Sequence, residues 1–207
     1  MGNKDRNQEI AEVYRSLFIQ HGASAHGVRW DDEFQQMVRL KILLGIADIS
    51  NTKILDFGCG YGQMLNYLKQ QNINVDYTGI DLVDEYLEFG RQNYPEARFC
   101  QQQDIENETF DYIFLSGLFT ADRGDDCRKF WQDTIHWCFS RASKGIAFNM
   151  WSKYAEFHME KRYYEDPGEV FRFAKQLDIR CNLTIRNDYI TPEDRFSPHD
   201  FTVYLQK

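Results

Sequence analysis

The segment Asp56-Phe57-Gly58-Cys59-Gly60-Tyr61-Gly62-Gln63 joins a short apolar run, residues 53–57, to an amphipathic stretch that begins at Met64. Its glycines permit a tight turn and a close approach of the backbone to a ligand. Dinucleotide-binding enzymes place the pattern G-x-G-x-x-G between a strand and a helix. Counted from Gly58, the third glycine of that pattern falls at position 63, which is Gln63. The segment therefore predicts a nucleotide-type loop that departs from the dinucleotide pattern.

Two acidic residues accompany this loop at the ends of neighbouring predicted strands. Asp56 precedes the glycines, where a carboxylate repels a pyrophosphate and suits an ammonium or sulfonium group. Asp81 ends the next strand, 21 residues after Gly60, where a carboxylate accepts hydrogen bonds from ribose hydroxyls. The pattern favours a nucleoside whose tail is positively charged rather than phosphorylated.

Short apolar runs alternate with amphipathic helices along most of the chain. The predicted strands are residues 53–57, 76–81, 97–100, 110–116, 144–150, 179–185 and 201–205. The predicted helices are one with the apolar stripe Ile10, Val13, Leu17 and Phe18, one that begins at Asp31 or Asp32, residues 64–71, 84–94 and 127–140, and one opened by Pro167-Gly168.

This order predicts an α/β fold with a doubly wound, mostly parallel, seven-stranded Rossmann-like sheet. The last two strands lack an intervening helix, so we expect an antiparallel hairpin at the sheet edge. We expect one domain over residues 1–207, with 1–50 as a helical cap or lid and 51–207 as the Rossmann-like core.

The amino-acid composition excludes some classes of binding partner. Lys and Arg number 24 against 32 Asp and Glu, a formal charge of −8, which argues against nucleic acid and anionic membrane surfaces as partners. No apolar run is long enough for a transmembrane helix, and the polar start resembles no signal peptide. Five cysteines without a C-x-x-C pair indicate reduced thiols, a cytoplasmic location and no metal site. A homodimer is expected on general grounds alone.

Four segments together resemble the class I S-adenosylmethionine-dependent methyltransferases. ILDFGCGYG (residues 54–62) is similar to the first motif of that family and YTGIDL (77–82) to the second. QQQDI (101–105) resembles the adenine-contacting segment, and FDYIFLSGLF (110–119) the strand beneath the methionine part. The resemblance covers roughly residues 50–207 and implies S-adenosyl-L-methionine as the cofactor.

The resemblance implies which residues hold the methionine part of the cofactor. Asp56, Gly58 and Gly60 would contact the methionine end, while Ser116 and Gly117 would lie near the sulfonium.

It also implies which residues hold the nucleoside. Asp81 would hold the ribose, Leu82 and Ile105 would enclose the adenine, and Asp104 would accept a hydrogen bond from its amino group.

A narrower resemblance points to a bacterial methyltransferase group that modifies small molecules or cell-surface sugars. It is carried by Tyr14, His21-Gly22 and Trp30, and by the segments GIAFNMWSKY (145–154) and YYEDP (163–167). It implies a small-molecule acceptor, with Tyr14 and Trp30 packed on the cofactor.

No residue stands out as an obligatory catalytic base. His21 and His26 lie in a glycine-containing loop between two predicted helices, where a histidine could act as a general base under a closing lid. Tyr154 and His158 follow the fifth predicted strand, over the expected acceptor pocket.

The function predicted from the sequence is S-adenosylmethionine-dependent methylation of a small molecule, with oxygen slightly favoured over nitrogen as the methylated atom. Three alternatives stay open. They are a non-catalytic S-adenosylmethionine-binding partner subunit, a nicotinamide-dependent oxidoreductase, against which Gln63 speaks, and a protein or nucleic-acid methyltransferase, against which the acidic charge speaks.

Overall fold

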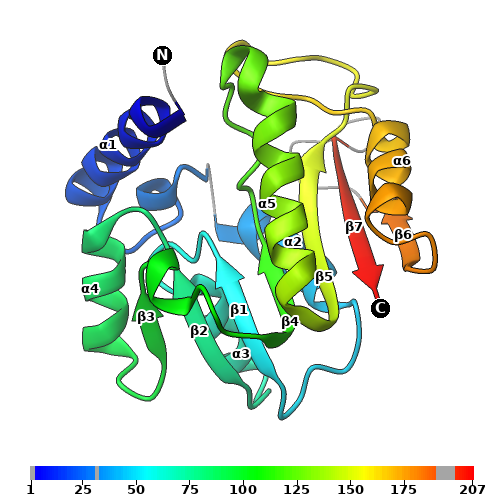
Figure 1. The fold of residues 1–207 in the computed structure, drawn as a ribbon. Coiled ribbons are helices and arrows are strands. Elements are labelled where there is room, and N and C mark those ends of the chain that lie inside the picture. The colour runs from blue at the N-terminus through cyan, green and yellow to red at the C-terminus, as the bar shows by residue number, and fades with distance from the viewer. Residues whose placement is uncertain (1–2, 31–32, 190–198) are drawn as a thin grey trace.

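A seven-stranded sheet forms the centre of the structure, a computed structural model that describes residues 3–30, 33–189 and 199–207 (Figure 1). The strands are β1 (Lys53–Phe57), β2 (Asp76–Ile80), β3 (Arg98–Cys100), β4 (Phe110–Leu115), β5 (Ala142–Trp151), β6 (Asn182–Arg186) and β7 (Asp200–Gln206). Their order in the sheet is β3-β2-β1-β4-β5-β7-β6. The first five strands pair in parallel and β7 pairs antiparallel with both of its neighbours, which confirms the predicted fold class.

The closing hairpin has β7 inside the sheet and β6 at its edge. All residues of β7 except the last are buried, because its apolar side chains alternate between two covered faces. The predicted strand over 179–185 begins too early, since β6 starts at Asn182. The amide of Arg180 donates to the Asp178 side chain in a turn that precedes β6, and Ile179 is 79% exposed.

Helices cover both faces of the sheet (Figure 1). They are α1 (Asn3–His21), α2 (Glu33–Leu44), α3 (Gln63–Gln70), α4 (Asp84–Asn93), α5 (Cys127–Arg141) and α6 (Pro167–Leu177), with the short 3₁₀ helices η1 (His26–Val28), η2 (Gln102–Ile105) and η3 (Gly124–Asp126). The expected start of the second helix, at Asp31 or Asp32, lies outside the described residues. None of the helices in the described ranges combines the length and hydrophobicity that a bilayer crossing demands.

Two apolar cores result, one on each face of the sheet. Side chains of α5 and α6, among them Trp131 and Val170, pack on alternate residues of the strands, such as Ile113. Side chains of α2, α3 and α4 pack on the other alternate residues, such as Phe114. The period-two alternation of buried side chains explains why β4 is apolar at nearly every position.

Helix α1 lies beyond the carboxyl ends of the parallel strands and packs there through aromatic side chains (Figure 1). Its inward face holds Ala11, Tyr14 and Phe18, which lie against Tyr61 and other residues of the third core cluster. The predicted stripe was wrong at Val13, which is 49% exposed. A spacing of three and four residues places positions 11, 14 and 18 on one side of the helix and turns position 13 outward.

A buried ion pair ties α2 to the sheet. The guanidinium of Arg39 donates to both carboxylate oxygens of Asp200 at the start of β7, with 3.3 Å between Nη2 and Oδ1. The exposed fractions of the two side chains are 1% and 0%. The same guanidinium lies 4.6 Å from the ring centre of Trp30, so it also contacts the segment that ends at residue 30.

We expect Arg39→Met to lower the free energy of unfolding by about 3–5 kcal/mol, because it removes the guanidinium that pairs with the buried Asp200 carboxylate. The double variant Arg39→Met/Asp200→Leu should recover a large part of that loss. Urea denaturation measures both. Lys129→Met, which breaks the exposed pair between Lys129 and Asp133, is the control and should change stability little. A double variant as unstable as the sum of its single changes would contradict this account.

Candidate functional site

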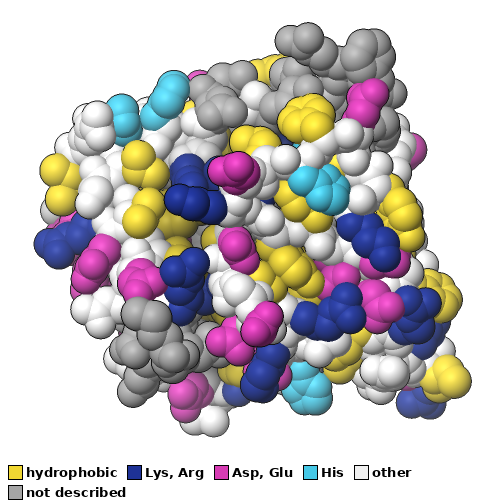
Figure 2. All heavy atoms as spheres, turned by 90° about the horizontal axis from the view of Figure 1, so that it is seen from above, with side chains coloured by type: hydrophobic (Ala, Val, Ile, Leu, Met, Phe, Trp, Pro, Cys, Tyr) yellow, Lys and Arg dark blue, Asp and Glu magenta, His cyan; other side chains and the backbone are white. Residues whose placement is uncertain are grey.

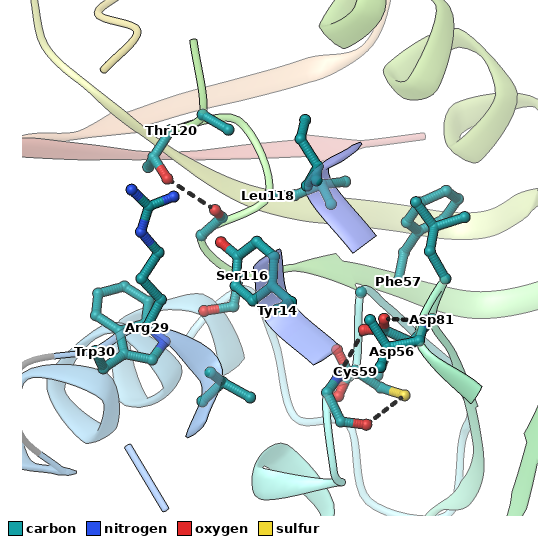
Figure 3. Close-up of a pocket in the computed structure, with 18 of the residues that line it drawn as sticks. Tyr14, Arg29, Trp30, Asp56, Phe57, Cys59, Asp81, Ser116, Leu118 and Thr120 are labelled. Carbon is teal, nitrogen blue, oxygen red and sulfur yellow. Dashed lines mark hydrogen bonds between the residues drawn. The ribbon is translucent and has the colours of Figure 1, made fainter. Parts of the chain in front are cut away.

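A cavity of about 470 Å³ lies at the carboxyl ends of the parallel strands. Loops after β1, β2, β3, β4 and β5 line its floor, and α1 and residues 28–30 cover it from the other side. In the close-up of Figure 3, Asp56 and Asp81 lie on one side of the view, Arg29 and Trp30 on the other, and Tyr14 and Ser116 between them. The cavity therefore has an acidic end at the glycine loop and a basic, aromatic end beyond Ser116.

The glycine loop is fastened to the neighbouring strand by backbone hydrogen bonds. The amides of Gly58 and Cys59 both donate to the carbonyl of Ile80, at 2.8 and 3.0 Å. Gly60 has a φ of 54°, and a Cβ there would lie 3.0 Å from Cγ1 of Val28. The bare backbone thus lets residue 28 of the cover approach the loop closely.

Asp81 bridges the glycine loop and the turn after β2. One of its carboxylate oxygens accepts from the amide of Gly60 at 2.9 Å, and the other accepts from the amide of Val83 at 3.0 Å. Burial raises its pKa, and these backbone hydrogen bonds oppose the rise. A carboxylate has about four acceptor positions, so Asp81 keeps capacity for the two hydroxyls of a ribose.

Asp56 is buried at the end of β1 and holds its place through Tyr77. The hydroxyl of Tyr77 donates to the Asp56 carboxylate at 2.7 Å. Burial raises the pKa of Asp56 to about 7, against the opposing effect of that hydrogen bond, and the charge of Asp81 adds to the rise. A cationic group beside these two carboxylates would stabilise the ionised form of Asp56. This end of the cavity therefore suits a positively charged ligand group.

The turn after β4 lies on the cavity wall, where Asn149 and the ring of Trp30 contact it. The amide of Gly117 donates to the buried side chain of Asn149 at 2.7 Å. A Cβ at Gly117 would lie 2.9 Å from the ring of Trp30, so only glycine lets this ring reach the turn. The Ser116 hydroxyl is buried on the cavity wall and has no hydrogen-bond partner within the described part of the chain. Such an atom is suited to a ligand that supplies the missing partner.

Nine of the eleven residues predicted to bind the cofactor line this one cavity. They are Tyr14, Trp30, Asp56, Gly58, Gly60, Asp81, Leu82, Ser116 and Gly117.

Asp104 and Ile105 do not lie on the cavity wall. The Asp104 carboxylate accepts from the amide of Gln101 in a capping box at the start of η2, and Ile105 is fully buried in the core. Gln101 and Gln102 line the cavity at this point instead. The Asp104 carboxylate therefore caps the start of a short helix, which is a structural role.

The four candidates for a catalytic role lie outside the cavity. His21 and His26 are exposed, with ring centres 5.7 Å apart, and His158 stacks on Tyr164. Tyr154 is 68% exposed and its hydroxyl donates to Asp166. The histidine that does line the cavity is His199, which is buried next to Trp151 and Phe157.

Several polar residues of the cavity wall were not foreseen. They are Gln35, Gln36 and Arg39 from α2, Arg123 from the loop before η3, Arg162 from the segment before α6, and His199. For α2 a signal existed, because polar residues at positions 35, 36 and 39 lie on the same side of the helix as the buried Leu40 and Leu43. Arg123, Arg162 and His199 lie far apart in the sequence, and only the tertiary structure brings them to one cavity.

Comparisons with known proteins match this chain mainly to methyltransferases. Residues 54–138 match the family model described as a methyltransferase domain. A protein of Mycobacterium tuberculosis that carries the name of a methyltransferase, Rv1506c, is 30% identical over 166 residues, which span 74% of this chain and 92% of that protein. An S-adenosyl-L-methionine-dependent Diels-Alderase of Neonectria, iliD, is 28% identical over 90 residues, which cover 44% of this chain and 36% of that protein.

Solved structures show the same fold at low identity. The magnesium protoporphyrin IX methyltransferase of Synechocystis, solved with bound S-adenosylmethionine, superposes with a TM-score of 0.67 at 13% identity, over 97% of this chain and 96% of that one. The plantazolicin methyltransferase BamL superposes with a TM-score of 0.65 at 12% identity, over 97% of this chain and 99% of that one.

Asp56→Asn should stabilise the ligand-free protein at about pH 8, by roughly 1–3 kcal/mol. The folded-state pKa of Asp56 is raised to about 7, so protonation stabilises the fold at low pH and this contribution is lost as the pH rises through about 7. Asparagine keeps an acceptor for Tyr77 and carries no charge. The gain should therefore shrink as the pH falls toward about 4, near the ordinary pKa of an aspartate.

Urea denaturation at about pH 5 and about pH 8 measures this difference. Asp76→Asn, at an exposed position of β2, is the control and should show no such gain. An Asp56→Asn variant that is less stable than the wild type at both pH values would refute the assignment of a raised pKa to Asp56.

Proposed function

The chain belongs to the class I S-adenosylmethionine-dependent methyltransferases, and from that premise we propose that it methylates a small molecule, with oxygen slightly favoured over nitrogen as the methylated atom. It uses S-adenosylmethionine as the methyl donor. The proposal concerns the acceptor, the methylated atom and the roles of individual residues.

The observation that carries the proposal is the continuity of the cavity past Ser116. Beyond the residues expected to hold the cofactor, the same cavity is lined by Trp151, Phe157, Met159 and His199. Small-molecule sites are concave and mostly apolar, with a few polar groups that orient the ligand. A transferase needs a second binding region next to the turn after β4 for its acceptor. A protein that only binds the cofactor has no need of such a region.

The outer surface also favours a small acceptor over a nucleic acid. Figure 2 shows the molecule from the top of Figure 1, with Lys and Arg side chains interspersed among Asp and Glu and exposed hydrophobic groups. Neutralising a phosphate backbone requires a broad basic surface. Two structural neighbours are named as methyltransferases of magnesium protoporphyrin IX and of plantazolicin, and they are small-molecule precedents within this fold.

The chain's residues would act by binding and orientation. When bound, the sulfonium of S-adenosylmethionine supplies an activated methyl group and a good leaving group. Asp81 would hold the ribose, Asp56 would face the cationic tail, and the Ser116 hydroxyl would satisfy a polar atom near the sulfonium. The cover made by α1 and residues 28–30 would exclude water from the line of transfer.

Proton removal is the remaining task for a hydroxyl acceptor. Burial raises the pKa of Tyr14, while the charges of Arg29 and Arg162 oppose the rise, so Tyr14 keeps its proton and can donate a hydrogen bond. His199 is the imidazole on the cavity wall and we assign it the role of general base. An imidazole at the acceptor end of the cavity supports oxygen as the methylated atom, because a hydroxyl acceptor has a proton to lose.

We further propose that residues 1–50 act as a cap within a single domain of residues 1–207. The Tyr86 hydroxyl donates to the carbonyls of Gly27, at 2.6 Å, and Tyr14, at 3.2 Å, which ties both parts of the cap to α4. These two bonds, the aromatic contacts of Phe18 and the hydrogen bond from Arg123 to Asn7 hold α1 and η1 over the cavity, whereas α2 packs on the sheet. The five cysteines are all free and buried, in keeping with a cytoplasmic location.

Two alternatives have less support. The relationship to a Diels-Alderase shows that S-adenosylmethionine binding in this superfamily accompanies other chemistry, and a non-catalytic partner subunit is the related possibility. A nicotinamide-dependent oxidoreductase fits neither Gln63 nor the family to which the chain belongs.

Thermal unfolding with S-adenosylmethionine, S-adenosylhomocysteine, NAD and NADP tests the cofactor site. At about 100 times its Kd, a ligand adds about 2.7 kcal/mol, which raises the Tm by several degrees. We expect a rise with the first two only, and its loss in Asp81→Asn. Asp48→Asn, an exposed position with the same charge change, should retain it. A rise with NAD or NADP alone would overturn the cofactor assignment.

Formation of S-adenosylhomocysteine with a panel of small hydroxyl, carboxyl and amine compounds tests methyl transfer. We expect turnover with at least one oxygen nucleophile, and a loss of about 100-fold or more in His199→Gln with little change in S-adenosylhomocysteine affinity. Binding of the cofactor without transfer to any panel member would favour the non-catalytic alternative.

A further inference from the structure

The cavity wall holds a buried arginine whose charge no carboxylate of the described chain neutralises. Arg123 is 9% exposed, and burial lowers the pKa of its guanidinium. One of its terminal nitrogens donates to the side chain of Asn7 at 2.7 Å. Its Nε is buried and has no partner among the residues that the structure describes. A buried cation with only neutral partners is costly, so its presence at a cavity calls for an anion.

Two carboxylates, one adjacent to Arg123 in the sequence and one on the same cavity wall, have other partners. Asp122 accepts from the amide of Gly124 at 2.9 Å, and Asp133, which lines the cavity, pairs with Lys129. No ion pair within the described ranges includes Arg123. Arg123 is therefore a buried cation without a carboxylate partner among the described residues, in a chain with a formal charge of −8.

The arginine is also held in a fixed orientation. Its guanidinium lies 3.6 Å from the ring centre of Phe130, on α5, and its backbone amide donates to the Cys127 sulfur. Stacking on one face leaves the edges of the guanidinium for hydrogen bonds. A planar fork held in this way matches the two oxygens of a carboxylate or phosphate.

The position of Arg123 separates it from the nucleoside end of the cavity. Arg123 lies in the loop after β4, where it contacts Asn7 and Phe130, whereas Asp81 follows β2, on the other side of β1 in the strand order. In Figure 3, Tyr14 lies between Asp81 at the acidic end and Arg29 at the other. A cofactor held at its ribose by Asp81 and at its cationic tail by Asp56 leaves Arg123 facing the second ligand.

We propose that the methyl acceptor carries an anionic group, a carboxylate or a phosphate, on an apolar or aromatic body, and that Arg123 binds this group. The inference rests on the proposed function, since it names the class of acceptor at that same site. Arg29, which also lines the cavity and forms no ion pair with a described carboxylate, adds positive charge from the cap. The apolar body would lie against Phe130 and the other rings of the wall. The anion would complete the hydrogen bonds of Arg123 and hold the acceptor in register with the methyl group.

The test titrates benzoate and phenyl phosphate, with the neutral benzyl alcohol as comparison, into the protein saturated with S-adenosylhomocysteine. Calorimetry and the rise in Tm report binding. We expect at least one of the two anions to bind and benzyl alcohol to bind far more weakly. Arg123→Gln should weaken anion binding about 10- to 100-fold, and Arg123→Lys, which keeps the charge but not the fork, less than that.

Controls separate this role from folding and from general electrostatics. Arg180→Gln removes one positive charge from a side chain that is 89% exposed, and it should leave anion binding unchanged. Arg123→Gln removes no partner of a buried carboxylate, so the variant should fold, and its own Tm verifies this. Its affinity for S-adenosylhomocysteine should stay within about threefold of the wild type.

Three results would overturn the proposal. The first is that neither anion binds to the wild-type complex, and the second is that both bind Arg123→Gln as tightly as the wild type. The third is that Arg123→Gln weakens S-adenosylhomocysteine but not 5′-methylthioadenosine, which lacks the carboxylate, because Arg123 would then hold the cofactor. If S-adenosylhomocysteine does not bind the wild type at all, the proposed function fails, and titration of the anions into the protein alone still decides the role of Arg123.

Discussion

The hydrogen bond from the amide of Gly60 to the carboxylate of Asp81 is the interaction on which the site depends. It joins the loop after β1 to the end of β2, two points that parallel pairing brings to the same edge of the sheet. The second oxygen of the same carboxylate holds the turn that begins α4. Because α1 and η1 pack on α4 and on the loop, the cover of the cavity is positioned by the same bridge. A carboxylate at the end of β2 thus organises both the floor and the cover of the site.

The distribution of charge along the cavity follows from that arrangement. Asp56, which is buried, and Asp81, which is half-buried and accepts from the amide of Gly60, both lie at the glycine loop. Desolvation raises both pKa values, so this end gains from a cation. Arg29 lies past Tyr14 in Figure 3, and Arg123 on the cavity wall has no carboxylate partner among the described residues, so that end gains from an anion. A cofactor with a cationic tail and an acidic acceptor would each reduce an electrostatic cost that the empty protein bears. Ligand binding would therefore stabilise the fold more than contact area alone suggests.

The local parts of the structure were predictable from the sequence, and the assembled parts were not. The strand-glycine-helix unit and the position of Asp81 directly after β2 depend on patterns within a few residues or at a fixed interval, and the order of apolar runs was enough to predict the sheet. The position of β7 inside the sheet was missed because the sequence does not reveal which strand of a hairpin pairs with β5. Arg123 and His199 reach the cavity through loops whose paths depend on tertiary packing. Asp104 matched a family pattern, but its carboxylate caps η2 and lies off the cavity wall.

Calorimetric titration of S-adenosylmethionine at pH 7, in two buffers with different heats of ionisation, tests the central claim most directly. The account predicts binding with release of about half a proton at pH 7, because the cationic ligand drives Asp56 from a pKa of about 7 to the ionised state. About two units higher in pH, Asp56 is already ionised and its share of the proton release should vanish. Failure to bind, or uptake of a proton at pH 7, would contradict the account.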